Sequence, residues 1–253
     1  MIKSPDGRQE RRSGASRSAT SPLVLALGSI FFVGVIVLIG ELTVRGRLWW
    51  APDEERSKQV FDVGLRHDAL ATMSDWIGHL TVPTVLRVVT LICAVLLWRR
   101  GLRAVALWWA ATMLISGALA IGSRYLVARQ RPHWPGSGPL VEGYTFPSGH
   151  AANAAVFAGC IVIITWPYLG RIGRAATSLA GLVFFVAVGA SRLVLGVHRI
   201  SDVVAAWALA AALLLAMLAV AAEPRVRPRF SPTPAAPAAR EAGAARQPGL
   251  RGS

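Results

Sequence analysis

Six predominantly apolar stretches, each of about 20 residues, recur along this chain, and no other feature restricts its fold so strongly. They cover approximately residues 22–42, 76–98, 103–123, 148–168, 175–195 and 201–222. A helix of about 20 apolar residues can cross the hydrocarbon core of a bilayer. In lipid every backbone polar group has to be satisfied within the protein, and a helix achieves this within one segment. The sequence therefore predicts an all-α, polytopic membrane protein with six transmembrane helices in a bundle.

The charge of the chain fits this prediction and also predicts an orientation. The 253 residues are 54% hydrophobic, yet they include 27 Lys and Arg against 13 Asp and Glu, a net charge of +14. A disordered basic protein would lack the apolar residues, so we expect the charges in loops and tails and no nucleic-acid partner. Basic residues are frequent in both tails and in the turns at 99–103 and 170–174. By the positive-inside rule these segments are cytoplasmic, in a multi-pass protein of the plasma (inner) membrane.

Three segments outside the spans have distinct predictions. Residues 1–20 and 223–253 are rich in Arg together with Ser, Gly, Pro or Ala, and we expect both to be disordered cytoplasmic tails on either side of a membrane domain at 21–222. From Phe61 to Leu80 apolar residues recur at helical spacing. This pattern predicts one amphipathic helix that lies against membrane lipids and runs into the second span.

Three polar motifs remain that membrane topology does not require. They are Arg124-x6-Arg131-Pro132, Pro147-Ser148-Gly149-His150 and Ser191-Arg192-x5-His198-x3-Asp202. If the N-terminus is cytoplasmic, each motif lies at an extracytoplasmic end of a span. The sequence therefore predicts that three arginines, two histidines and an aspartate gather at one face of the membrane.

The first property of this set is that it suits a compact, multiply charged anion. The guanidinium groups of Arg124, Arg131 and Arg192 present planar donors that match phosphate oxygens. Ser148 and Gly149 open a helix, whose free N–H groups and positive dipole end attract an anion. The anion that fits most simply is a phosphoryl group.

The second property is that the histidines can carry out transfer of that group. His198 and Asp202 share a face if the stretch is helical, and a carboxylate on one ring nitrogen leaves the other nitrogen as a nucleophile. His150, beside the helix start, can protonate a leaving oxygen. Asp202 is the only carboxylate of the three motifs, so we expect neither a metal ion nor another cofactor.

The motifs resemble those of the type 2 phosphatidic acid phosphatase superfamily, which also includes vanadium haloperoxidases. The family pattern is Lys-x6-Arg-Pro, Pro-Ser-Gly-His and Ser-Arg-x5-His-x3-Asp, and this chain departs from it at Arg124, where Lys is usual. The resemblance implies that His198 forms a phosphohistidine, that Asp202 orients it, and that His150 protonates the leaving group and then activates water. It implies phosphate binding for Arg124, Arg131, Ser148, Gly149 and Arg192.

The function expected on this basis is metal-independent hydrolysis of a lipid phosphate or diphosphate at the extracytoplasmic face. Undecaprenyl diphosphate and phosphatidic acid are examples of such substrates. Two alternatives stay open: a lipid phosphotransferase that uses the same intermediate, and a non-enzymatic protein that binds or transports lipids. Of the other charged residues, we expect Arg129 and Arg199 to extend toward lipid headgroups, and Arg87 to pair within the bundle.

Overall fold

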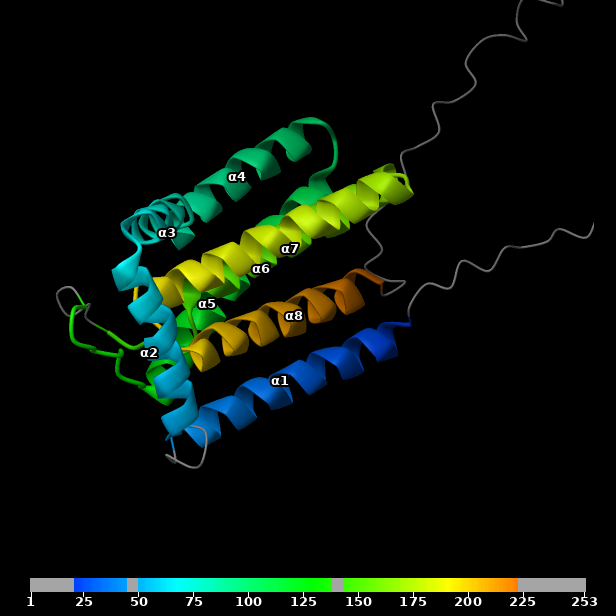
Figure 1. The fold of residues 1–253 in the computed structure, drawn as a ribbon. Coiled ribbons are helices and arrows are strands. Elements are labelled where there is room, and N and C mark those ends of the chain that lie inside the picture. The colour runs from blue at the N-terminus through cyan, green and yellow to red at the C-terminus, as the bar shows by residue number, and fades with distance from the viewer. Residues whose placement is uncertain (1–20, 45–49, 138–142, 223–253) are drawn as a thin grey trace, which may run out of the picture.

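The computed structural model of the protein describes residues 21–44, 50–137 and 143–222, which form helices and their connections (Figure 1). The helices are α1 (Pro22–Val44), α2 (Trp50–Arg66), α3 (Asp68–Leu80), α4 (Pro83–Arg99), α5 (Arg103–Val127), α6 (Gly149–Thr165), the 3-10 helix η1 (Trp166–Tyr168), α7 (Arg171–Val194) and α8 (Ile200–Ala222). An isolated bridge joins Gln130 to Tyr144, and there is no β-strand in the described ranges. The all-α prediction is confirmed, whereas the predicted tails lie outside the described residues.

The protein is a multi-pass membrane protein. Among the described residues, five helical segments are long and apolar enough to cross a membrane, namely α1, α5, α6 with η1, α7 and α8. A sixth candidate consists of α3 and α4, which are bent by 47° relative to one another. The bend follows from Pro83, which starts α4 at a position that needs no N–H donor and keeps Val82 in an extended conformation. The straight part of the second span therefore begins at Pro83 and not near residue 76 as expected.

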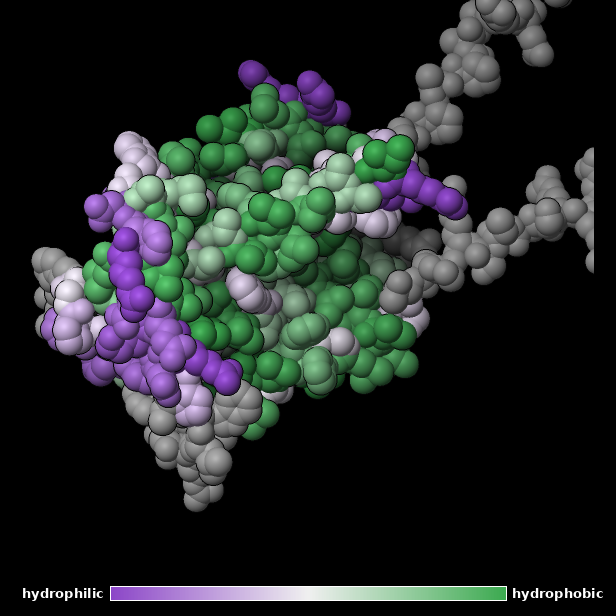
Figure 2. Space-filling view, in the orientation of Figure 1, coloured by the Kyte–Doolittle hydropathy of each residue, from purple (hydrophilic) through white to green (hydrophobic). Residues whose placement is uncertain are grey.

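The prediction of a single amphipathic helix over 61–80 is wrong, because the structure has two helices there. The chain breaks at His67, whose φ of −133° and ψ of 88° are not helical, so α2 ends at Arg66 and α3 begins at Asp68. Helix α2 crosses the end of the bundle and is not collinear with α3 (Figure 1). It carries most of the hydrophilic surface at that end (Figure 2). Its apolar residue Phe61 is buried and stacks on Trp134 with ring centroids 5.5 Å apart.

Helix α6 occupies the core of the bundle. It packs against α5, α7 and α8, and its alanines at 151, 152 and 154 are completely buried. Such small side chains let neighbouring helices approach closely, which is the usual basis of packing between membrane helices. Helix α1 lies on the outside, packed along α8, with the Ser29 hydroxyl donating to the Ala212 carbonyl at 2.9 Å.

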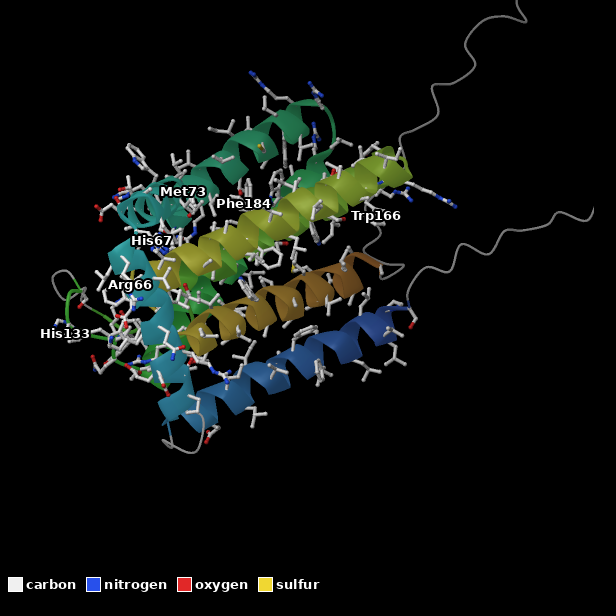
Figure 3. The ribbon with its side chains drawn as sticks, in the orientation of Figure 1. Arg66, His67, Met73, His133, Trp166 and Phe184 are labelled. Carbon is white, nitrogen blue, oxygen red and sulfur yellow. The ribbon has the colours of Figure 1, made fainter. Side chains whose placement is uncertain are left out.

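The surface divides into an apolar belt and two polar ends. Hydrophobic residues cover the sides of the bundle, and hydrophilic ones gather over α2 and around the opposite helix ends (Figure 2). Arg66, His67 and His133 lie at the α2 end, whereas Trp166 lies at the opposite end (Figure 3). This arrangement is the one expected of a protein surrounded by a bilayer, with its loops at the two interfaces.

Candidate active site

All three sequence motifs lie at the α2 end of the bundle. Arg124 is in the last turn of α5 and Arg131 in the loop that follows it; Ser148, Gly149 and His150 start α6; Arg192 is in the last turn of α7; His198 is in the α7–α8 loop; and Asp202 is in the first turn of α8. The chain direction of the helices brings these segments together, because α5 and α7 end where α6 and α8 begin. The eight predicted site residues therefore come from four helix ends of one bundle.

The three arginines surround the first turn of α6, and we refer to Arg124, Arg131 and Arg192 as the arginine cluster. Arg124 lies so close to Gly149 that a methyl group at that position would overlap its guanidinium. Electrostatically, His150 is within reach of all three arginines and of His198. The glycine is thus required for close approach and not for an unusual backbone angle.

Backbone carbonyls hold two members of the cluster in place. Arg131 Nη1 donates to the carbonyl of Val197 at 3.1 Å, and Arg192 Nη2 donates to that of Ser74 at 3.1 Å. The guanidinium of Arg192 also lies against Gly78 of α3, where a methyl group would overlap it. Helix α3 therefore positions a site residue that belongs to α7.

The arginine cluster has no carboxylate partner within 4.0 Å in the described part of the chain. Burial lowers the pKa of Arg131 below its ordinary value, and the neighbouring positive charge of Arg124 lowers it further. Both effects mean that the cluster carries positive charge which is poorly compensated by the protein. A bound anion would compensate it through charge-assisted hydrogen bonds.

The start of α6 is also tied to the third motif. The buried Ser148 caps the helix, its hydroxyl accepting from the Ala151 N–H at 3.5 Å. The Ser148 N–H donates to the backbone carbonyl of Asp202 at 3.1 Å. Amides of the first helical turn have no partner within their own helix and are suited to an anion. The Pro-Ser-Gly-His segment is therefore fixed relative to His198 and Asp202.

Contact between His198 and Asp202 is largely indirect. His198 Nδ1 is 3.5 Å from Asp202 Oδ2, and both side chains are buried. The hydroxyl of Thr145 lies between them, 2.8 Å from His198 Nδ1 and 2.7 Å from Asp202 Oδ2. Burial lowers the pKa of His198 below its usual value, and the Asp202 carboxylate opposes this shift without cancelling it. His198 is therefore a neutral imidazole near pH 7.

The second oxygen of Asp202 belongs to a network below the site, which we call the carboxylate network. It consists of Asp53, Glu54 and Ser57 from α2 with Arg129, Arg199, Ser201 and Asp202. Arg129 bridges two carboxylates, with Nη1 donating to Asp202 Oδ1 at 2.6 Å and Nη2 to Asp53 Oδ2 at 2.9 Å. Arg199 pairs with Glu54 and donates to the Gln130 carbonyl.

This network overturns one expectation. Arg129 and Arg199 were expected to extend toward lipid headgroups, but both are buried, with 6% and 5% of their surface exposed. Asp53 and Glu54, more than 70 positions earlier in the chain, supply the compensating charge. A run of acidic residues at 53–55 was the signal in the sequence for this pairing.

The structure also defines the surroundings of Arg87 and His133. Arg87 is half-buried and lies against Gly117 of α5, so it faces the bundle; its pairing there stays a prediction. His133 is exposed at the α2 end and contacts Ser137 at 3.3 Å (Figure 3). Thr145, which contacts both His198 and Asp202, was not among the site residues predicted from the sequence.

A polar cavity of about 160 Å³ opens beside His150. It is lined by Asp75, Gly78, His79, Val82, His150 and Arg192. Asp75 and His79 come from α3, on the side of His150 that belongs to α3 and α7. In the described residues, no three His, Cys, Asp or Glu side chains are grouped so that they could hold a metal ion.

Comparison with known proteins agrees with this geometry. Residues 105–225, which include all three motifs, match the model of the PAP2 superfamily. Over 101 residues the chain is 33% identical to phosphatidylglycerophosphatase B of Bacillus subtilis (strain 168); the match covers 36% of this chain and 49% of that protein, about half of its length. The fold is similar to the crystal structure of a transmembrane PAP2-type phosphatidylglycerolphosphate phosphatase from Bacillus subtilis, with a TM-score of 0.61 and 25% identity over 79% of this chain and 94% of that one. Over its motif-bearing residues 105–225 the chain is therefore similar to the PAP2 superfamily.

Proposed function

We propose that the protein is a metal-independent phosphatase that hydrolyses a phosphate ester of a membrane lipid through a phosphohistidine intermediate. One observation carries the proposal: the arginine cluster surrounds the start of α6 within electrostatic reach of two histidines, at one end of a membrane bundle. A phosphoryl group held there would lie between a nucleophile and a proton donor. Phosphoryl transfer requires mainly positioning and stabilisation of charge, and arginines supply both.

In the first step the lone pair of His198 Nε2 attacks phosphorus. A P–N bond forms as the P–O bond to the lipid breaks, and His150 gives its proton to the departing oxygen. The arginine cluster and the first amides of α6 stabilise the charge on the phosphoryl oxygens. The products of this step are the lipid alcohol and phosphorylated His198.

In the second step His150, now neutral, removes a proton from water as that water attacks phosphorus. The P–N bond breaks, inorganic phosphate leaves, and His198 and His150 return to their starting states. If a lipid or sugar hydroxyl replaced water here, the same site would act as a phosphotransferase.

The polar cavity supports a substrate whose phosphate is attached to a polar headgroup. A leaving group protonated by His150 departs on the side where Asp75, His79 and Arg192 line that cavity. The relatives are named for phosphatidylglycerophosphate, in which a terminal phosphate is attached to a glycerol headgroup. Such a headgroup offers hydroxyls to the cavity while its acyl chains stay in the bilayer. We therefore favour this class over a phosphate joined directly to a hydrocarbon-rich alcohol.

The distribution of basic residues supports a site on the extracytoplasmic side. The helix ends opposite the site carry Arg99, Arg100, Arg103, Arg171 and Arg174. These arginines lie in short turns, where the positive-inside rule applies most strongly. The arginine cluster is at the other end, and its charges are required there for an anion.

The direct test is release of inorganic phosphate by the detergent-solubilised protein. Phosphatidylglycerophosphate, phosphatidic acid and undecaprenyl diphosphate are compared side by side, with and without EDTA. We expect fastest release from phosphatidylglycerophosphate and the same rate with EDTA. Phosphate that appears only on an acceptor alcohol would identify a transferase, release that requires added metal would refute the metal-free mechanism, and absence of any transfer would favour a non-enzymatic protein.

A further inference from the structure

The hydroxyl of Thr145 lies between the side chains of His198 and Asp202. Asp202 follows His198 by four residues, but the carboxylate does not reach the ring within ordinary hydrogen-bond distance, since Nδ1 and Oδ2 are 3.5 Å apart. Thr145 Oγ1 makes two shorter contacts, of 2.8 Å to His198 Nδ1 and 2.7 Å to Asp202 Oδ2. All three side chains are buried, so water does not compete with these hydrogen bonds.

The protons in this arrangement can be assigned by counting donors. A hydroxyl has one proton, and an ionised carboxylate can only accept. Asp202 is ionised because it pairs with Arg129 and also accepts the Arg199 N–H at 2.9 Å. The Thr145 proton therefore goes to Asp202 Oδ2. The remaining contact requires His198 Nδ1 to be the donor, with the Thr145 oxygen as acceptor.

We propose that Thr145 is a positioning residue that fixes the tautomer of His198, with Nδ1 protonated and Nε2 unprotonated. The inference rests on the proposed function insofar as it concerns turnover, because Nε2 is the nitrogen that has to attack phosphorus. Asp202 then acts on His198 mainly through Thr145.

The backbone around Thr145 supports this role. Gln130 and Tyr144 form an antiparallel bridge, and the Thr145 N–H donates to the Arg129 carbonyl at 3.0 Å. The loop that carries Thr145 is thus joined to the loop of Arg129, whose side chain holds the other oxygen of Asp202. Thr145 and Arg129 approach the Asp202 carboxylate from two loop segments that are hydrogen-bonded to each other. This connection fixes the Thr145 hydroxyl between His198 and Asp202.

The kinetic test compares T145V, T145S and the control T112V in the phosphate-release assay. Valine keeps the shape of threonine and removes the hydroxyl, whereas serine keeps the hydroxyl. Thr112 is as completely buried as Thr145, but its hydroxyl donates to the Trp108 carbonyl within α5. For T145V we expect kcat to fall roughly 10- to 100-fold, the range typical when an outer partner that orients a histidine is removed, with KM changed less than about twofold. T145S should keep at least about a third of kcat, and T112V should match the wild type.

The second measurement does not depend on turnover. The protein contains five histidines, so ¹⁵N-labelled histidine with H198A as the assignment control identifies the ring signals of His198. We expect a protonated Nδ1 and an unprotonated Nε2 in the wild type at neutral pH, and loss of this single tautomer in T145V.

The outcomes separate this inference from the proposed function. A wild-type His198 protonated at Nε2 would overturn the role of Thr145, and so would a T145V protein as active as T112V. Absence of phosphate release by the wild type would refute the proposed function, while the ¹⁵N signals would still decide the tautomer. If T145V does not fold, the wild-type signals alone give that answer.

Discussion

Two groups of arginines lie within one end of the bundle, and they differ in how their positive charge is compensated. Arg129 of the carboxylate network touches two carboxylates at 2.6 and 2.9 Å, whereas Arg131 of the arginine cluster, two residues later, contacts a backbone carbonyl. A buried charge without a partner is costly. In the carboxylate network, acidic residues of α2 offset this cost, whereas for the arginine cluster we propose that a bound anion does so. We therefore expect the carboxylate network to contribute to stability and the arginine cluster to bind the proposed substrate anion.

The largest predicted effect concerns His198, the proposed nucleophile, which lies next to the arginine cluster. Replacement of His198 by Ala should lower phosphate release by roughly 10⁴-fold or more, because no other group can form the covalent intermediate. The variant should still fold, since the ion pairs of the carboxylate network stay in place. H133A, at an exposed histidine of the same end, is the matched control. Full activity of H198A would refute the mechanism.

Removal of Arg129 tests the carboxylate network. R129A leaves the buried Asp202 and the partly buried Asp53 without their shared cation, and breaking a buried pair costs about 3–5 kcal/mol of unfolding free energy. Denaturant unfolding in detergent measures this change. R131A, two residues away, removes a charge that has no carboxylate partner in the described residues, and it should leave the stability nearly unchanged. Equal destabilisation by the two variants would remove the distinction on which the comparison rests.

Removal of Arg192 tests whether the arginine cluster contributes to activity. We expect R192A to lower kcat/KM by roughly 10²- to 10³-fold, the usual effect of deleting one donor that stabilises charge in a transition state. R174A, at the opposite helix ends, should behave like the wild type. An R192A protein with normal kcat/KM would show that the cluster does not bind the reacting phosphate.

Orthovanadate, a phosphate mimic, tests anion binding by the arginine cluster without any assay of turnover. An anion that binds the folded protein at 100 times its Kd stabilises it by about 2.7 kcal/mol. We expect a vanadate-dependent rise in Tm for the wild type, a loss of that rise in R131A, and a normal rise in R171A. A rise that survives in R131A would place the anion elsewhere.

The smallest predicted effect is that of mild acid. Burial lowers the folded-state pKa of His198 below its ordinary 6.5, so the imidazole stays neutral and nucleophilic at pH 6.5. Activity that depends on this group should fall only below pH 6.5. The unfolded state takes up a proton more readily, so stability should also decrease as the pH falls from 6.5 toward the folded-state pKa. The stability change should disappear in H198N, whereas an acidic limb of the wild-type activity above pH 6.5 would contradict the shift.

The parts of the molecule that the sequence could predict are those encoded locally. Length and hydropathy predicted the spans, and the motif spacings predicted which residues face one end of the bundle. The break at His67 was missed because the apolar period continues through it, and periodicity does not report backbone angles. The burial and ion pairing of Arg129 and Arg199 were not predicted because their partners on α2 are distant in sequence. Thr145 was missed for a similar reason: its role depends on two loops meeting, and a single threonine carries no spacing pattern.

The contact between α1 and α8 has a consequence for how the protein is made. Ser29 and its partner Ala212 are 183 residues apart. At ribosomal speeds of 5–20 residues per second, α1 waits roughly 10–40 s before α8 has been synthesised. During that time the surface of α1 that packs along α8 lacks its partner helix. The bundle therefore closes only after α8 has been made, and a chain that stops before α8 would leave α1 inserted without the helix along which it packs.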